Sequence, residues 1–106
     1  MKQYDKLVRD GVPAILLAGG HNPVSKTLVG KELLAALRAK VDEEVAEYDA
    51  ALDDDQAADE LADLVEIATA MARQRGCSEN RMMQLRATRS PQLGVYDRGI
   101  FLVEMD

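Results

Sequence analysis

Two pairs of acidic residues, placed symmetrically about a run of aspartates, constrain this chain more than any other feature. The first pair is Glu44 and Glu47, and the second is Glu60 and Asp63. Acids three positions apart lie on one side of a helix. The midpoint of the two inner acids and the midpoint of the two outer acids both fall within Asp53–Asp55. The spacing therefore predicts a helical hairpin that turns at the aspartates and brings the carboxylates level with one another.

Carboxylates gathered in one small volume repel each other strongly unless a cation lies among them. Their oxygens are hard ligands of the kind that Mg²⁺ and Mn²⁺ prefer in proteins. The pattern therefore indicates a site for Mg²⁺, with Mn²⁺ as the alternative, whose ligands would be Glu44, Glu47, Glu60 and Asp63.

The direction of the side chains also favours acids that face one another. Apolar residues recur at about 100° per residue along both stretches, so each helix carries one apolar stripe. On this helical projection Glu44 and Glu60 lie inside the apolar sectors, whereas Glu47 and Asp63 lie on their borders. An acid in an apolar sector is costly unless it has a partner. We therefore expect the two pairs to turn toward each other.

The alternative interpretation is a pair of solvated, acid-rich helices that hold no metal. Of the 19 acids in the chain, 12 lie within Asp42–Glu66, with no Lys or Arg among them, so some acid pairs occur there by chance. Glu43 points away from the apolar stripe and is ranked below the four ligands. We interpret four further acids as solvated surface residues, namely Asp42, Asp49, Asp59 and Glu66.

Apolar periodicity and capping residues predict helices along most of the chain. A short helix is expected over residues 12–18 and two long helices over residues 31–52 and 55–75. Ser78 is expected to cap a further helix, which Pro91 should end. The fold class predicted is therefore all-α, a helical bundle built on an antiparallel helical hairpin.

Two segments outside the helices contain β-branched residues, and the first of them, residues 24–29, also alternates in polarity. Residues 24–29 and 99–104 are predicted to be short strands, which could pair as a small two-stranded ribbon. No repeat or linker divides the chain, so we expect residues 1–106 to form a single domain.

Composition excludes several classes of protein. A formal net charge of −6 argues against binding of polymeric nucleic acid through its phosphates. No apolar run approaches the ~20 residues needed to cross a bilayer, and the charged first residues lack the core of a signal peptide. The one cysteine, Cys77, fits a reducing compartment. We therefore expect a cytoplasmic protein that does not bind a membrane.

Few other residues suggest chemistry. His21 is the only histidine and is expected in an exposed loop, and Cys77 has no partner in sequence and is expected to be an inert thiol. Lys6 and Arg9 place two cations near the N-terminus. The residues alone leave open whether these cations form surface ion pairs or contact phosphate.

The acids and their flanks resemble a known superfamily. Glu43–Glu47 followed by Glu60–Asp63 is similar to the signature of the all-α nucleoside triphosphate pyrophosphohydrolases, the MazG-like superfamily. The segments Tyr4–Pro13 and Gly94–Leu102 are similar to the opening and close of its phosphoribosyl-ATP pyrophosphohydrolase-like branch. The chain departs from that branch at Val95, where a second glycine is expected.

The resemblance implies a dimer or tetramer that hydrolyses a nucleotide between the α and β phosphates in a Mg²⁺-dependent reaction. It places Glu43 near the water activated by the metal or near a second ion. The catalytic residues implied are Glu43, Glu44, Glu47, Glu60 and Asp63. Basic residues would bind the phosphates, and the candidates are Lys6, Arg9, Arg86, Arg89 and Arg98.

We therefore predict a nucleoside triphosphate pyrophosphohydrolase that yields a nucleoside monophosphate and pyrophosphate. The alternative substrate is phosphoribosyl-ATP, an intermediate of histidine synthesis. The alternative from another class is a non-catalytic acidic helical module that oligomerises or binds a partner without metal. Release of pyrophosphate from nucleotides in the presence of Mg²⁺ separates these classes.

Overall fold

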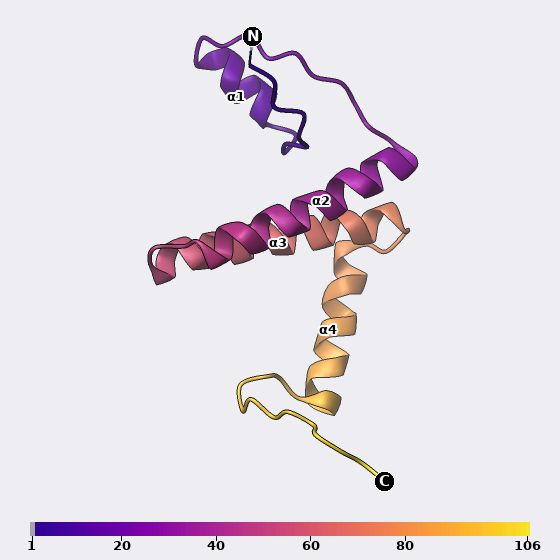
Figure 1. Cartoon of the computed structure of the whole chain (residues 1–106). Coiled ribbons are helices and arrows are strands. Elements are labelled where there is room, and N and C mark those ends of the chain that lie inside the picture. The colour runs from indigo at the N-terminus through magenta and orange to yellow at the C-terminus, as the bar shows by residue number, and fades with distance from the viewer. Residues whose placement is uncertain (1) are drawn as a thin grey trace.

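A computed structural model describes residues 2–106 of the chain. These residues contain four α-helices in succession, joined and flanked by irregular segments. The first helix, α1, is short and begins at its proline turn, and α2 and α3 are the longest elements (Figure 1). The all-α prediction is confirmed. The bounds of the helices are α1 Val12–Ala18, α2 Gly30–Asp49, α3 Asp54–Gln74 and α4 Glu79–Leu93.

Helices α2 and α3 pack against each other as the antiparallel hairpin that the acid spacing predicts (Figure 1). The turn lies where it was expected, because Asp53 caps α3 and its side chain accepts a hydrogen bond of 2.8 Å from the backbone N–H of Gln56. The Gln56 side chain in turn accepts a bond of 3.0 Å from the backbone N–H of Leu52. The first bond satisfies an N–H group that a helix start leaves free, and the second ties the first turn of α3 to the residue before its cap. They therefore fix the point at which the chain reverses.

Helix α4 leaves the end of α3 at a steep angle (Figure 1). Ser78 caps it as predicted, by accepting a hydrogen bond of 3.1 Å from the backbone N–H of Arg81. The prediction that Pro91 ends the helix is wrong, since α4 continues to Leu93. Proline removes one N–H near the helix end, but the Gly94 N–H still bonds the Ser90 carbonyl at 2.8 Å. The helix ends at Leu93, and Gly94, which follows it, has a φ of 87° in a region that favours glycine.

The predicted β-ribbon is absent from residues 2–106. Residues 24–29 and 99–104 contain no strand, and they lie on opposite sides of the hairpin (Figure 1). An isolated two-stranded ribbon is marginally stable in water unless it packs on other elements. The β-branched residues of these two segments therefore lie in irregular chain and not in a strand pair.

The chain buries little apolar surface on its own. Leu37 and Ile67 are the buried hydrophobic residues of the described chain. The radius of gyration is 17.7 Å, compared with about 13 Å for a compact chain of this length. The accessible surface is 9494 Å², whereas a compact monomer of this mass exposes about 5,800 Å². No described helix combines the length and the apolar character needed to cross a membrane.

Candidate metal centre

Three of the four predicted ligands come together between α2 and α3. Glu44, Glu47 and Glu60 each place a carboxylate oxygen within 4.8 Å of the others. We call these three residues the acid cluster. The hairpin turn positions them, because it sets Glu47 on α2 level with Glu60 on α3. The structure thus brings acids from both sides of the turn into one small volume.

Glu44 and Glu60 lie in register with the small core of the hairpin. Positions seven apart on a helix have nearly the same direction. Leu37 and Glu44 stand in this relation on α2, and Glu60 and Ile67 stand in it on α3. Leu37, Glu44 and Ile67 are all buried. The same faces that pack the hairpin therefore carry these carboxylates inward.

Burial leaves two carboxylate oxygens without a partner. Glu44 is only 6% exposed. One oxygen, Oε2, of both Glu44 and Glu60 is buried and has no hydrogen-bond partner among the described residues. A buried charge without a partner is strongly unfavourable. A divalent cation fits this donor set, because it would neutralise the carboxylates and occupy the free lone pairs.

The electrostatics of the acid cluster respond to this crowding. The hydrogen bond that Glu47 and Glu60 can share only when one of them is protonated raises the pKa of Glu47, and burial and repulsion from Glu60 and Glu43 act in the same direction. A hydrogen bond from protonated Glu60 to Glu44 likewise raises the pKa of Glu60, although the corresponding interaction with Glu47 partly opposes this. Two carboxyl groups can share a hydrogen bond only when one carries a proton. When all are ionised, these contacts become repulsive.

Asp63, the fourth predicted ligand, does not join the acid cluster. Its Oδ1 accepts a hydrogen bond of 2.7 Å from Nη2 of Arg9, in the segment before α1. Its charge nevertheless contributes to the raised pKa of Glu60. Asp63 therefore lies at the edge of the site, with a protein cation as its partner.

Glu43 also has protein partners in place of the acid cluster. Its Oε1 lies 3.1 Å from Nζ of Lys40 and 3.7 Å from Nζ of Lys6. The sequence interpretation overlooked Lys40, although its charge and its position three residues before Glu43 are typical of a helical ion pair. The segment before α1 thus contacts both helices of the hairpin, α2 through Lys6 and α3 through Arg9.

The other candidate basic residues lie away from the acid cluster within one chain. Arg86 and Arg89 belong to the second half of α4, and Arg98 follows it in the C-terminal segment. Helix α4 extends away from the hairpin, starting from the end opposite the Asp53 turn (Figure 1). Of the five candidates for phosphate binding, only Lys6 and Arg9 are therefore held at the site by contacts within the described chain.

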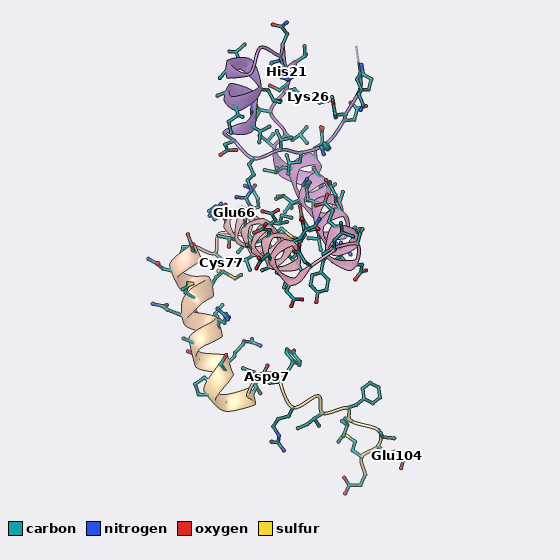
Figure 2. All side chains as sticks on the ribbon, turned by 90° about the vertical axis from the view of Figure 1, so that its left-hand side faces the viewer. His21, Lys26, Glu66, Cys77, Asp97 and Glu104 are labelled. Carbon is teal, nitrogen blue, oxygen red and sulfur yellow. The ribbon has the colours of Figure 1, made fainter. Side chains whose placement is uncertain are left out.

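His21 and Cys77 are well separated. Figure 2 shows His21 in the loop after α1 and Cys77 at the corner between α3 and α4. Cys77 is a free thiol. The two residues do not form a cysteine–histidine pair, so the acid cluster remains the candidate centre for chemistry.

Comparison with known proteins bears on the class of this site. An uncharacterized protein of Mycolicibacterium smegmatis (strain ATCC 700084 / mc(2)155) is 54% identical over 46 residues. The aligned part covers 43% of this chain and 47% of that protein, so the chain spans about half the length of the curated relative it matches. No solved structure matches the chain.

A family model gives the broader match. The model described as phosphoribosyl-ATP pyrophosphohydrolase matches residues 21–89, which include the whole hairpin and the acid cluster. Enzymes of this family are hydrolases that act on phosphoric anhydride bonds. Because the match covers more than half of the chain, the protein belongs to the phosphoribosyl-ATP pyrophosphohydrolase family, within the MazG-like superfamily.

Proposed function

We propose that this protein is a divalent-metal-dependent nucleotide pyrophosphohydrolase. It hydrolyses the anhydride bond between the α and β phosphates and yields a nucleoside monophosphate and pyrophosphate. One observation carries the proposal, namely the two buried carboxylate oxygens of Glu44 and Glu60 that have no partner among the described residues. The family match supports the same class of reaction.

The residues that would hold Mg²⁺ or Mn²⁺ are Glu44, Glu47 and Glu60, with Asp63 at the edge of the site. Such a cation supplies charge neutralisation at the phosphates and makes a water more acidic. Glu44 closes the inner side of the site because it is buried, whereas Glu47 is exposed. The nucleotide therefore approaches from the side of Glu47.

The chain itself supplies the cations that would bind the phosphates. Lys6 and Arg9 reach the acids that flank the acid cluster. Charge-assisted hydrogen bonds from Arg to phosphate can be bidentate, which fixes orientation as well as adding affinity. Lys6 and Arg9 would thus hold the phosphate tail so that the anhydride bond lies over the carboxylates.

Phosphoribosyl-ATP and nucleoside triphosphates both contain the bond to be cleaved. The name of the family favours phosphoribosyl-ATP, whereas the signature in the sequence favoured nucleoside triphosphates. A panel with both kinds of substrate, followed for pyrophosphate in the presence of Mg²⁺, tests the proposal and ranks the substrates. Release of pyrophosphate from at least one of them is expected.

Variants make this assay specific to the acid cluster. Glu60→Gln should abolish most of the activity, because it removes a carboxylate but little volume. Asp59→Asn is the matched control, since it removes the same charge from the neighbouring exposed residue. Equal activity in wild type and Glu60→Gln would exclude the acid cluster as the catalytic centre.

The rival proposal is a non-catalytic acidic helical module. Unpartnered carboxylate oxygens inside the hairpin disfavour it, because a purely structural module gains nothing from burying them. If the protein binds no divalent cation and hydrolyses no nucleotide of the panel, the rival becomes the better account.

We also propose that the protein acts as a homodimer or homotetramer in the cytoplasm. The accessible surface of 9494 Å² and the exposed apolar side chains of α2, α3 and the C-terminal segment support an assembly. A neighbouring subunit could bring Arg86, Arg89 or Arg98 to the phosphates. The free thiol of Cys77 fits a reducing compartment.

A further inference from the structure

We propose that Arg9 is an exchangeable counterion of the site. Without metal, Arg9 pairs with Asp63 and holds that carboxylate outside the acid cluster. When a divalent cation binds, Asp63 turns to the cation and Arg9 passes to a phosphate of the nucleotide. This inference rests on the proposed function, and it assigns to Arg9 a role in both metal binding and substrate binding.

The geometry of Asp63 is the first support. Its partner is Arg9 at 2.7 Å, and it is absent from the group of carboxylates that approach within 4.8 Å. Asp63 nevertheless follows Glu60 by three residues on α3, so the two side chains lie on the same side of the helix. It thus lies next to the acid cluster while its carboxylate is engaged elsewhere.

The exposure of the pair makes an exchange feasible. The side chains of Arg9 and Asp63 are 60% and 43% exposed. Exposed ion pairs contribute little stability, so breaking one costs little. The backbone of Arg9 is tied to the start of α1, because its carbonyl accepts a hydrogen bond of 3.0 Å from the Val12 N–H. The exchange therefore needs only a rotation of side chains.

Electrostatics favour the exchange in the stated direction. Metal-free, the guanidinium of Arg9 offsets part of the negative charge around Glu60 and Asp63. A divalent cation at the acid cluster repels that guanidinium and attracts Asp63. The planar guanidinium matches a phosphate group in a bidentate manner. The incoming nucleotide therefore offers Arg9 a partner when Asp63 leaves it.

Lys6 can be released from the same segment by similar reasoning. It lies 3.7 Å from Glu43, but Lys40 is closer to that carboxylate, at 3.1 Å. Glu43 thus remains paired when Lys6 turns to a phosphate. The segment before α1 can therefore release Lys6 and Arg9 without leaving an acid of the hairpin unpartnered.

Calorimetric titration with Mn²⁺ in the absence of nucleotide tests the exchange. Arg9→Gln should bind Mn²⁺ about two- to fivefold more tightly than wild type, the range set by the strength of an exposed ion pair. Arg38→Gln is the matched control, since Arg38 forms a similar exposed pair of 2.8 Å with Asp42 outside the acid cluster. It should leave the Mn²⁺ affinity unchanged.

Two further measurements separate exchange from simple loss of charge. With Mn²⁺ present, Arg9→Gln should bind an ATP analogue with a methylene α–β bridge more weakly than wild type. In an Asp63→Asn background, Arg9→Gln should no longer tighten Mn²⁺ binding, because the competing pair is already gone. Arg9→Gln should thus strengthen the binding of Mn²⁺ and weaken the binding of the nucleotide. A merely structural role for Arg9 would not produce opposite effects on the two ligands.

The outcomes distinguish the inference from the proposed function. If Arg9→Gln leaves the Mn²⁺ affinity unchanged while wild type binds, Arg9 does not compete with the metal for Asp63. If Arg9→Gln weakens Mn²⁺ binding, Arg9 instead holds Asp63 in place for the metal. Either result refutes the exchange. The metal site itself survives both results. If wild-type protein does not bind Mn²⁺, both the exchange and the proposed metal-dependent function are refuted.

Discussion

Glu44 on α2 and Glu60 on α3 each bury one carboxylate oxygen that has no hydrogen-bond partner among the described residues. The two helices place them on the faces that also carry Leu37 and Ile67, the buried apolar residues of the hairpin. The carboxylates and the core thus occupy the same interface. Any change that neutralises these carboxylates or gives them a partner should therefore change the free energy of unfolding of the hairpin.

Metal binding should stabilise the fold. A ligand that binds only the folded state at about a hundred times its dissociation constant adds about 2.7 kcal/mol to the free energy of unfolding. We expect saturating Mg²⁺ to raise the midpoint of urea unfolding of wild type. In Glu44→Gln this effect should be lost, while metal-free stability should equal or exceed that of wild type. A Mg²⁺ response as large in Glu44→Gln as in wild type would contradict the assignment.

The raised pKa values of Glu47 and Glu60 predict how metal-free stability depends on pH. The folded protein holds these protons more tightly than the unfolded chain, whose carboxyl pKa is 4.5. Their contribution to stability is fully present below that value and is lost as pH rises through the raised folded pKa values. When the pH is raised from about 5 to about 7, the free energy of unfolding without metal should therefore decrease less for Glu60→Gln than for wild type. Parallel urea titrations of both proteins at the two pH values provide the measurement.

Metal affinity should follow the opposite trend with pH. Protons and the cation compete for the same carboxyl oxygens, so the affinity for Mg²⁺ should increase as pH rises through the raised pKa values of Glu47 and Glu60. Calorimetry in two buffers with different ionisation enthalpies measures the protons released on binding. Zero release near the pH of half-titration would argue against competition at these carboxyls.

Asp63→Asn should retain the fold and lose most of the pyrophosphohydrolase activity. The substitution removes a charge that is only partly buried and changes little volume. Even groups that merely support metal ligands commonly contribute about 10- to 100-fold to activity, so a loss of at least this size is expected. Circular dichroism checks the fold, and Asp59→Asn serves again as the control. Turnover at the wild-type rate would show that Asp63 is dispensable.

The hairpin could be predicted from the sequence because its determinants are local. The periodicity of α2 and α3 and the cap at Asp53 act within a few residues. Once the chain turns at Asp53, the symmetric spacing sets the acids of α2 level with those of α3. The spacing alone therefore predicts that Glu44, Glu47 and Glu60 lie together, and the structure confirms it. The predicted bounds of the long helices differ from those of α2 and α3 by no more than a few residues.

The features that escaped prediction depend on contacts distant in sequence. Asp63 was expected in the acid cluster, but its partner, Arg9, lies far away along the chain. The segments 24–29 and 99–104 have the β-branched residues of strands, yet they lie on opposite sides of the hairpin and do not pair. Pro91 lacks one helical N–H, but the Gly94 N–H after it still bonds Ser90, so α4 extends two residues beyond the proline. The helix and strand propensities of single residues do not indicate which distant residues come into contact.

Assembly is the last prediction, and it follows from the face of the hairpin that remains uncovered. Leu37 and Ile67 are buried between the helices, whereas Leu61 and Val65 on α3 are 45% and 66% exposed. Burying such side chains contributes about 25 cal/mol per Å² of apolar area, and a typical stable interface covers about 800 Å² per partner. The accessible surface of the chain, 9494 Å², is large enough to contain an interface of this size. We therefore expect light scattering at micromolar concentration to give the mass of a dimer or a tetramer.

Val65→Asp tests which face forms that assembly. A charge at this position would be solvated in a monomer but buried and unpaired in an interface, so the variant should have a lower mass and lower activity. Gln74→Glu is the control, because it adds the same charge at an exposed position near the end of α3. A wild-type protein that is monomeric and fully active would refute both the assembly and any role for Arg86, Arg89 or Arg98 of a neighbouring subunit. If wild type is oligomeric and Val65→Asp retains the oligomeric mass, the assembly uses another apolar surface. The C-terminal segment around Phe101, which is 87% exposed, is then the next segment to be substituted.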